Sequence, residues 1–207
     1  AGDPPEGLRL LENTRMTTWG AANSGDLGEY PTPEADAARA AAIRESGATV
    51  ALVSGRHFQL DWLHETPRPL ECYRLAAEAC RARGLACWAH LDLTLFWQPA
   101  FALLRDHPEW PQRNLLDGTP TRWLCCNQPG LREFIARHLE AITRQGISGF
   151  MLDEVTFASK DGPYCGCQEC REKFWRKTGF RMPEYGDASV IGNRAHPLWR
   201  LWQEWQM

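Results

Sequence analysis

The sequence predicts an α/β fold of about four βα units, arranged as part of a (β/α)8 barrel (TIM barrel). Short runs that are apolar throughout alternate with segments that have the apolar period of a helix. Strands of that kind are typical of a parallel sheet whose two faces are covered. Polar residues follow several of the strands directly, at the position where a (β/α)8 barrel carries its functional residues.

The first two units follow a lead-in, residues 1–14, that has little periodicity. Residues 15–19 form a short candidate strand. Thr32 and Pro33 then predict a helix start, because Thr is a good N-cap and Pro suits the first helical position. That helix, over 34–46, is rich in alanine. The second unit combines an apolar strand over 49–53 with a helix over 70–83.

The third and fourth units have the clearest patterns. A strand over 86–91 precedes a long segment with many Pro and Gly residues, which is expected to be a loop. A regular amphipathic helix begins at Leu131 and is ended by Gly146, and an apolar strand over 147–152 and a helix over 168–177 follow. The remainder, 179–207, is a Gly- and Pro-broken loop ending in an incomplete Trp-rich helix.

Two architectures accommodate parallel βαβ units, a doubly wound open sheet and a (β/α)8 barrel. The open sheet calls for a Gly-rich phosphate-binding turn after the first strand, and Gly20 to Gly25 lacks the G-x-G-x-x-G spacing. The barrel is therefore favoured. A full barrel takes about 250 residues, so residues 1–207 are expected to be the N-terminal half of a catalytic domain. The missing half would belong to a longer protein or to an oligomeric partner.

Composition excludes several classes of partner. The 207 residues carry a net charge of −3 without a basic run, which argues against nucleic acid. No apolar run approaches the length of about 18 residues that a membrane span needs. No signal peptide is visible, although the chain starts at Ala1, and a cytoplasmic location is favoured over secretion.

Asp153 and Glu154 are the candidate catalytic residues, because they follow the fourth strand directly. Glycoside hydrolysis uses two carboxyl groups, one as general acid and one as nucleophile or base. Since side chains alternate along a strand, only one of these two is expected to face the substrate, and Asp153 is slightly favoured. The second carboxylate would come from the missing half. Polar or aromatic residues after the strands are expected to bind the carbohydrate: Trp19, Arg56, His57, His90 and Asp92.

Three cysteines, Cys165, Cys167 and Cys170, form a Cys-x-Cys-x-x-Cys cluster. Thiolates at this spacing suit a structural Zn²⁺ site, and tetrahedral zinc needs a fourth ligand. Cys126 is the expected fourth ligand, with its neighbour Cys125 as the alternative. Disulfides and free thiols remain other interpretations of the cluster.

The cysteine cluster and the acids before it resemble the family 42 β-galactosidases. Those enzymes have an Asn-Glu pair at the end of strand four, a zinc-binding Cys-x-Cys-x-x-Cys soon after it, and an upstream cysteine before a Pro-containing helix start. Cys125-Cys126-Asn127-Gln128-Pro129 matches that upstream position. The resemblance implies that Glu154 is the general acid/base, although Asp153 stands where that family has Asn.

Residues 47–58 and 149–153 resemble two strands of the family 29 α-L-fucosidases, one ending in a His-rich turn and one in the nucleophilic Asp. This resemblance implies that Asp153 is the nucleophile. Uncharacterised glycosidase families combine both sets of features and are the best match. The expected function is a retaining glycoside hydrolase that cleaves a terminal O-glycosidic bond, with a structural zinc site. The alternative is a non-catalytic barrel that binds carbohydrate or serves as a scaffold.

Overall fold

The computed structural model describes residues 14–19, 32–53, 68–92, 101–153, 163 and 165–206. The chain divides into two compact units. Unit 1 comprises the chain up to Asp92 together with Ala136–Asp153, and unit 2 comprises Leu93–Ile135 and Glu154–Met207. None of the helices in the described ranges is both long and apolar enough to cross a membrane.

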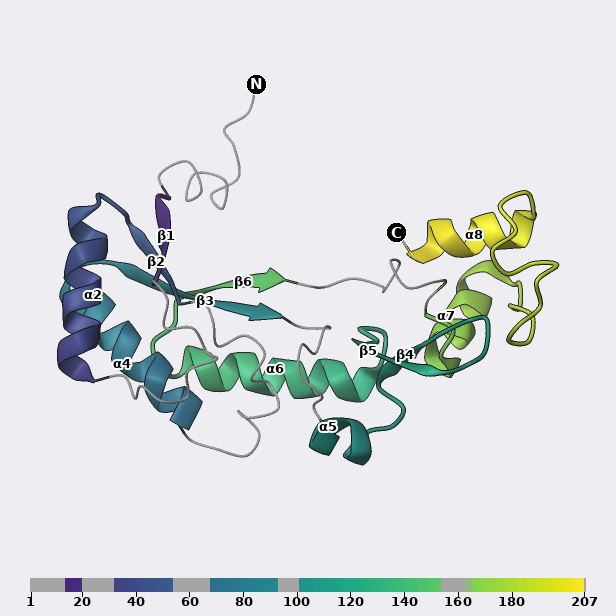
Figure 1. Cartoon of the computed structure of the whole chain (residues 1–207), viewed down its shortest axis with the longest axis horizontal. Helices are drawn as coiled ribbons and strands as arrows, with labels where there is room; N and C mark the ends of the chain where they lie inside the picture. The colour runs from purple at the N-terminus through teal and green to yellow at the C-terminus, as the bar shows by residue number, and fades with distance from the viewer. Residues whose placement is uncertain are drawn as a thin grey trace, which may run out of the picture. The chain divides into compact units, whose positions relative to one another are not determined.

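Unit 1 is built on a four-stranded sheet in which neighbouring strands are parallel (Figure 1). Its strands lie in the order β1 (Met16–Thr18), β2 (Val50–Val53), β3 (Ala86–Asp92) and β6 (Gly149–Asp153). The α/β class and the parallel sheet expected from the sequence are confirmed. Among the described strands the spatial order follows the chain order without a reversal, whereas a doubly wound sheet reverses at its switch point.

Two helices of unit 1 connect the first three strands, α2 (Pro33–Glu45) and α4 (Arg68–Ala82). The Thr32 hydroxyl accepts a hydrogen bond from the Ala35 amide, and Pro33 is the first helical residue, as the sequence predicts. α4 packs against β2 and β3, and α2 packs against α4. The buried face of α4 includes the small residues Ala76, Ala77 and Cys80, which permit close approach to the sheet.

The last strand, β6, is half-exposed. Met151 and Leu152 are 42% and 46% exposed, although both are large apolar residues. Among the described strands β6 lies at one edge of the sheet, with β3 as its neighbour. Unpaired backbone groups and apolar side chains at such an edge favour pairing with another strand.

Unit 2 contains elements in the segment expected to be a loop: α5 (Phe101–Asp106), β4 (Pro111–Arg113) and β5 (Pro120–Leu124). β4 and β5 form an antiparallel pair. Pro111 and Pro120 are each the first residue of a strand, where a missing backbone N–H is tolerated. The two prolines therefore start strands, although in the sequence they look like breakers.

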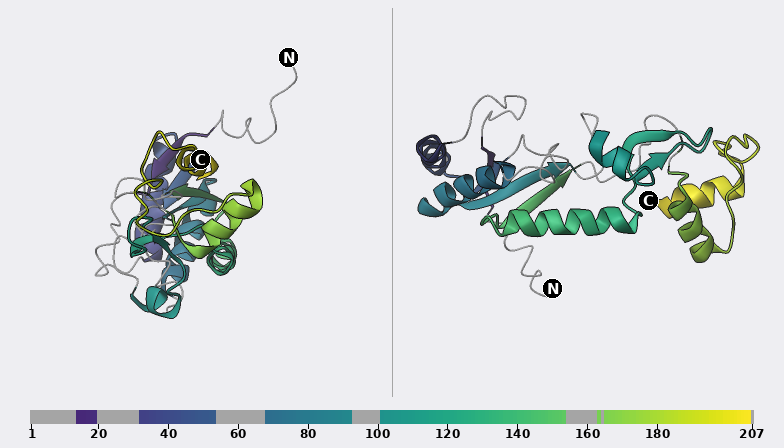
Figure 2. Two further views of the ribbon diagram at one scale, coloured as in Figure 1. Left: turned by 90° about the vertical axis from the view of Figure 1, so that its right-hand side faces the viewer. Right: turned by 90° about the horizontal axis from the view of Figure 1, so that it is seen from below.

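The other helices of unit 2 are α7 (Gln168–Thr178) and α8 (Pro197–Gln206), while α6 (Pro129–Thr143) starts in unit 2 and ends in unit 1. α7 and α8 lie side by side (Figure 2). The Phe174 ring of α7 packs edge-on against Trp202 of α8 at 4.8 Å between centroids, and Trp205 lies 5.6 Å from it. The Trp-rich end of the chain is thus a helix whose aromatic face forms part of a core.

Candidate metal centre and candidate active site

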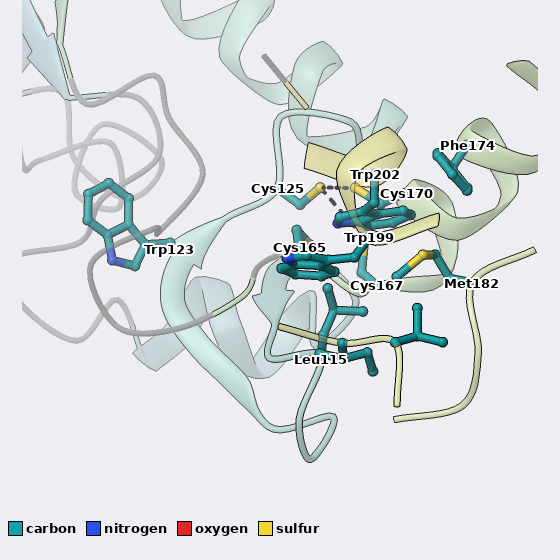
Figure 3. Packing of buried hydrophobic residues seen from close by; sticks show 12 residues of the cluster. Leu115, Trp123, Cys125, Cys165, Cys167, Cys170, Phe174, Met182, Trp199 and Trp202 are labelled. Atoms are coloured by element: carbon teal, nitrogen blue, oxygen red, sulfur yellow. Dashed lines mark hydrogen bonds between the residues drawn. The ribbon is translucent and has the colours of Figure 1, made fainter. Parts of the chain in front are cut away.

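Four cysteine side chains converge in the core of unit 2 (Figure 3). Cys125 follows the last residue of β5, Cys165 and Cys167 come from the loop before α7, and Cys170 lies in the first turn of α7. Their sulfur atoms all lie within 4.8 Å of one another, and each residue is at most 2% exposed. The rings of Trp199 and Trp202 belong to the same core cluster, so water is largely excluded.

Two of the sulfur–sulfur distances are close to those of a tetrahedral metal site. The Cys125 sulfur lies 3.4 Å from that of Cys170 and 3.6 Å from that of Cys167. Tetrahedral zinc, with Zn–S bonds of about 2.3 Å, places its sulfurs about 3.8 Å apart, whereas a disulfide bond is about 2.05 Å long. The cysteines are free thiols here. The donor set and its geometry therefore fit a metal ion that binds thiolates.

The cysteine thiols contact one another through hydrogen bonds. Hydrogen bonds with the thiols of Cys125, Cys165 and Cys170 hold the pKa of Cys167 well below its usual range. Hydrogen bonds with Cys165 and Cys167, together with burial, raise the pKa of Cys125. Hydrogen bonds with the other three thiols, together with burial, raise the pKa of Cys170. Cys167 is also the N-cap of α7, where the helix dipole favours negative charge.

Cys126, the expected fourth ligand, lies outside this group of four. Its side chain is partly exposed, and burial together with the neighbouring Cys125 raises its thiol pKa. Cys125 instead continues the buried end of β5. The chain turns after it, and the backbone N–H of Gln128 donates to the backbone carbonyl of Cys125 at 2.9 Å. Of the two neighbours, it is therefore Cys125, the alternative named from the sequence, that lies with the other three sulfurs.

Asn127 and Gln128, which the sequence interpretation did not single out, place their side-chain amides against the sulfurs. Asn127 Nδ2 donates to Cys170 Sγ at 3.3 Å, and Gln128 Nε2 contacts Cys167 Sγ at 3.7 Å. Their position directly after two cysteines, in the turn before a Pro-initiated helix, is the sequence signal that could have identified them.

A second site candidate lies at the carboxyl ends of β3 and β6 in unit 1. His90 Nε2 donates to Asp153 Oδ2 at 3.1 Å, since an ionised carboxylate can only accept. The side chain of His90 is 16% exposed and that of Asp153 is 51% exposed. Ala89 and Leu91, which flank His90 on the strand, are fully buried on the opposite face. Asp153 is therefore an accessible carboxylate held by a more buried imidazole.

The remaining predicted site residues are Trp19, Asp92, Arg56, His57 and Glu154. Trp19 is 2% exposed, and its backbone extends the pairing of β1 with β2 by donating to Leu52. The backbone of Asp92 pairs with that of Asp153 at the same end of the sheet. Arg56, His57 and Glu154 lie outside the described residues.

No family model matches the sequence, and no curated protein matches it. Solved structures share its fold at low identity. A β-galactosidase from the haloarchaeon Halorubrum lacusprofundi has a TM-score of 0.55 and 19% identity, over 79% of this chain and 24% of its own. A β-galactosidase from Marinomonas ef1 has a TM-score of 0.55 and 13% identity, over 79% of this chain and 25% of its own. A hypothetical protein from Ruminiclostridium thermocellum has a TM-score of 0.50 and 11% identity, over 70% and 78%.

The chain spans about a quarter of the length of the two β-galactosidases. At these identities the likeness is one of fold. Fold and site together define an α/β protein with a parallel sheet, a four-cysteine centre able to hold a metal ion, and a His–Asp pair at the carboxyl ends of two strands.

Proposed function

We propose that this chain is part of a barrel-type retaining glycoside hydrolase that acts on a terminal O-glycosidic bond. The observation that carries the proposal is the His90–Asp153 pair, an accessible carboxylate at the carboxyl end of a parallel strand. Active sites of (β/α)8 barrels lie at that end of the strands. The unreversed strand order and the fold shared with two β-galactosidases support the same proposal.

In this proposal Asp153 is the nucleophile. A retaining enzyme needs an ionised carboxylate beside the anomeric carbon and an acid about 5 Å away on the other side of the bond. The hydrogen bond from His90 restricts the orientation of the Asp153 carboxylate. Glu154 adjoins it in the chain, and the acid/base would come from a later strand.

The barrel itself is part of the proposal, supported by the exposed apolar residues of β6. Met151 and Leu152 are exposed on the edge strand next to Asp153. A fifth parallel strand paired with β6 would cover them and complete the surroundings of Asp153. The sheet would then gain its next strand beside β6, so that the spatial order would continue to follow the chain order.

The four-cysteine centre is proposed to be a structural zinc site. Cys125, Cys165, Cys167 and Cys170 would hold the ion, which when bound supplies a cross-link between the end of β5, the loop before α7 and α7 itself. Four thiolates close the coordination sphere, so these residues brace the fold and leave the chemistry to the carboxylates. Elemental analysis of the purified chain is expected to give about one zinc per chain.

The catalytic proposal is tested in a protein that contains this chain and its remaining strands. Asp153→Asn is expected to lower kcat/KM on the best aryl glycoside by about a thousandfold or more, because it removes the nucleophile. Asp117→Asn, at an exposed turn of unit 2, is the matched control and should leave the rate unchanged.

Wild-type hydrolysis by the double variant Asp153→Asn/Glu154→Gln would refute the assignment. A wild-type protein that binds glycosides without hydrolysing them would instead favour the non-catalytic carbohydrate-binding barrel.

A further inference from the structure

We infer that Asn127 and Gln128 are positioning residues of the four-cysteine centre, whose amide N–H groups stabilise the charge on the metal-bound sulfurs. The inference rests on the proposal that the centre holds a metal ion, and it adds the groups that set how tightly and how durably the ion is held. It concerns residues of this chain that lie next to the thiols and are not themselves ligands.

The centre needs such groups because of its charge and its burial. Four thiolates around a divalent ion leave two negative charges in excess, and all four cysteines are at most 2% exposed. Buried charge is costly unless hydrogen bonds or opposite charge compensate for it. The first turn of α7 supplies part of this compensation through its dipole. Hydrogen-bond donors directed at the sulfurs would supply more.

The orientation of the Asn127 amide is fixed by Lys173. The Lys173 ammonium donates to the backbone carbonyl oxygen of Asn127 at 2.7 Å and to its side-chain Oδ1 at 3.4 Å. With Oδ1 facing the ammonium, the NH2 group must face the other way, toward Cys170 Sγ at 3.3 Å. Glu169, 3.6 Å from the same ammonium, holds Lys173 in place along α7.

The orientation of the Gln128 amide is fixed in a similar way. Gln128 Nε2 donates to the backbone carbonyl of Glu109 at 2.9 Å, and its second N–H lies toward Cys167 Sγ at 3.7 Å. Both contacts require the NH2 group on this side, because a carbonyl oxygen and a thiolate only accept. Two successive residues of one turn thus direct donors at two different sulfurs.

Substitution of each amide by its acid tests the inference without changing the shape of the side chain. Asn127→Asp and Gln128→Glu replace the NH2 group with an oxygen that repels a thiolate. If Asn127 served only to hold Lys173, the carboxylate of Asn127→Asp would do so at least as well. Asn127→Ala removes the donor and adds no charge. Asn193→Asp is the matched control, because the Asn193 amide donates to the Ser189 carbonyl within its own turn.

The full chain is loaded with one equivalent of Zn²⁺, and the rate of metal transfer to a chromophoric chelator is measured. Asn127→Asp and Gln128→Glu are expected to release zinc about 10- to 100-fold faster than wild type. Asn127→Ala is also expected to release it faster, and Asn193→Asp at the wild-type rate. In the Co²⁺-loaded protein, the thiolate-to-cobalt charge-transfer bands of the two acid variants are expected at lower energy, because the sulfurs lose their hydrogen bonds.

Variants that bind one metal ion and keep the wild-type release rate and cobalt spectrum would overturn the role of Asn127 and Gln128, while the metal site would stand. A wild-type chain that takes up neither Zn²⁺ nor Co²⁺ would overturn both the site and this inference. If Asn127→Asp fails to fold, Gln128→Glu tests the same role at a different sulfur.

Discussion

Cys125→Ser and Cys126→Ser form a matched pair, since the two residues are neighbours in sequence and undergo the same substitution. Cys125 is fully buried with its sulfur 3.4 Å and 3.6 Å from two other thiols, whereas Cys126 is partly exposed and outside the group. We expect Cys125→Ser to lose most of its metal affinity and Cys126→Ser to keep it.

The size of the effect follows from the number of ligands. Structural zinc in zinc-finger peptides binds with about 10–16 kcal/mol at pH 7. Divided among four thiolates, this is about 3 kcal/mol for each ligand. Because 1.4 kcal/mol corresponds to a factor of ten, Cys125→Ser should weaken zinc binding about a hundredfold. Cys126→Ser should change stability by no more than about 0.5 kcal/mol.

The assay is competition of each purified variant against a chelator of known zinc affinity, together with thermal unfolding with and without metal. Wild type and Cys126→Ser should be stabilised equally by zinc, and Cys125→Ser much less at the same zinc concentration. The reasoning is refuted if Cys126→Ser loses zinc and Cys125→Ser retains it. That result would mean that the turn after β5 directs the other sulfur inward.

Gly149→Ala is expected to lower the free energy of unfolding by about 1–3 kcal/mol in urea denaturation, because a Cβ there would lie 2.6 Å from ring atoms of Trp88. An unchanged denaturation midpoint would contradict this expectation. Phe174→Ala should lower the free energy of unfolding by about 3–5 kcal/mol in the same measurement, since it removes the ring that packs against two Trp rings of α8. A decrease below about 1 kcal/mol would argue against that packing. Hydrogen bonds from the Thr119 amide and hydroxyl lower the pKa of Asp117. This interaction therefore stabilises the fold above about pH 4. The stabilisation is lost as the pH falls through the lowered pKa. In an NMR titration Thr119→Ala should move that pKa back up, and an unmoved pKa would show that the hydroxyl has no part in it.

The regular elements of unit 1 could be predicted because their patterns are local. The apolar runs that became β2, β3 and β6 stand between helical segments, and Thr32-Pro33 marks the start of α2. The hairpin of β4 and β5 could not be predicted in the same way. Its prolines occupy strand positions that need no N–H, and such positions are defined only by the partner strand.

The four-cysteine group could be predicted from the sequence except for the choice between the neighbours Cys125 and Cys126. The spacing of Cys165, Cys167 and Cys170 depends on local chain geometry and therefore is visible in the sequence. Which of Cys125 and Cys126 faces inward depends on how the end of β5 packs, because Trp123, Leu124 and Cys125 are all buried in succession. Alternation of side chains gives no guidance in such a run.

The positions of the four cysteines along the chain also affect the order in which the protein can fold. Cys125 and Cys170 are 45 residues apart. The chain between them leaves unit 2 within α6, forms β6 in unit 1, and returns. A cross-link that closes a loop of this length lowers the entropy of the unfolded chain by an equivalent of about 4 kcal/mol. Metal uptake would therefore hold together the two ends of this segment, which contains the strand that carries Asp153. Unit 1 would then receive β6 from a segment already tethered at both ends.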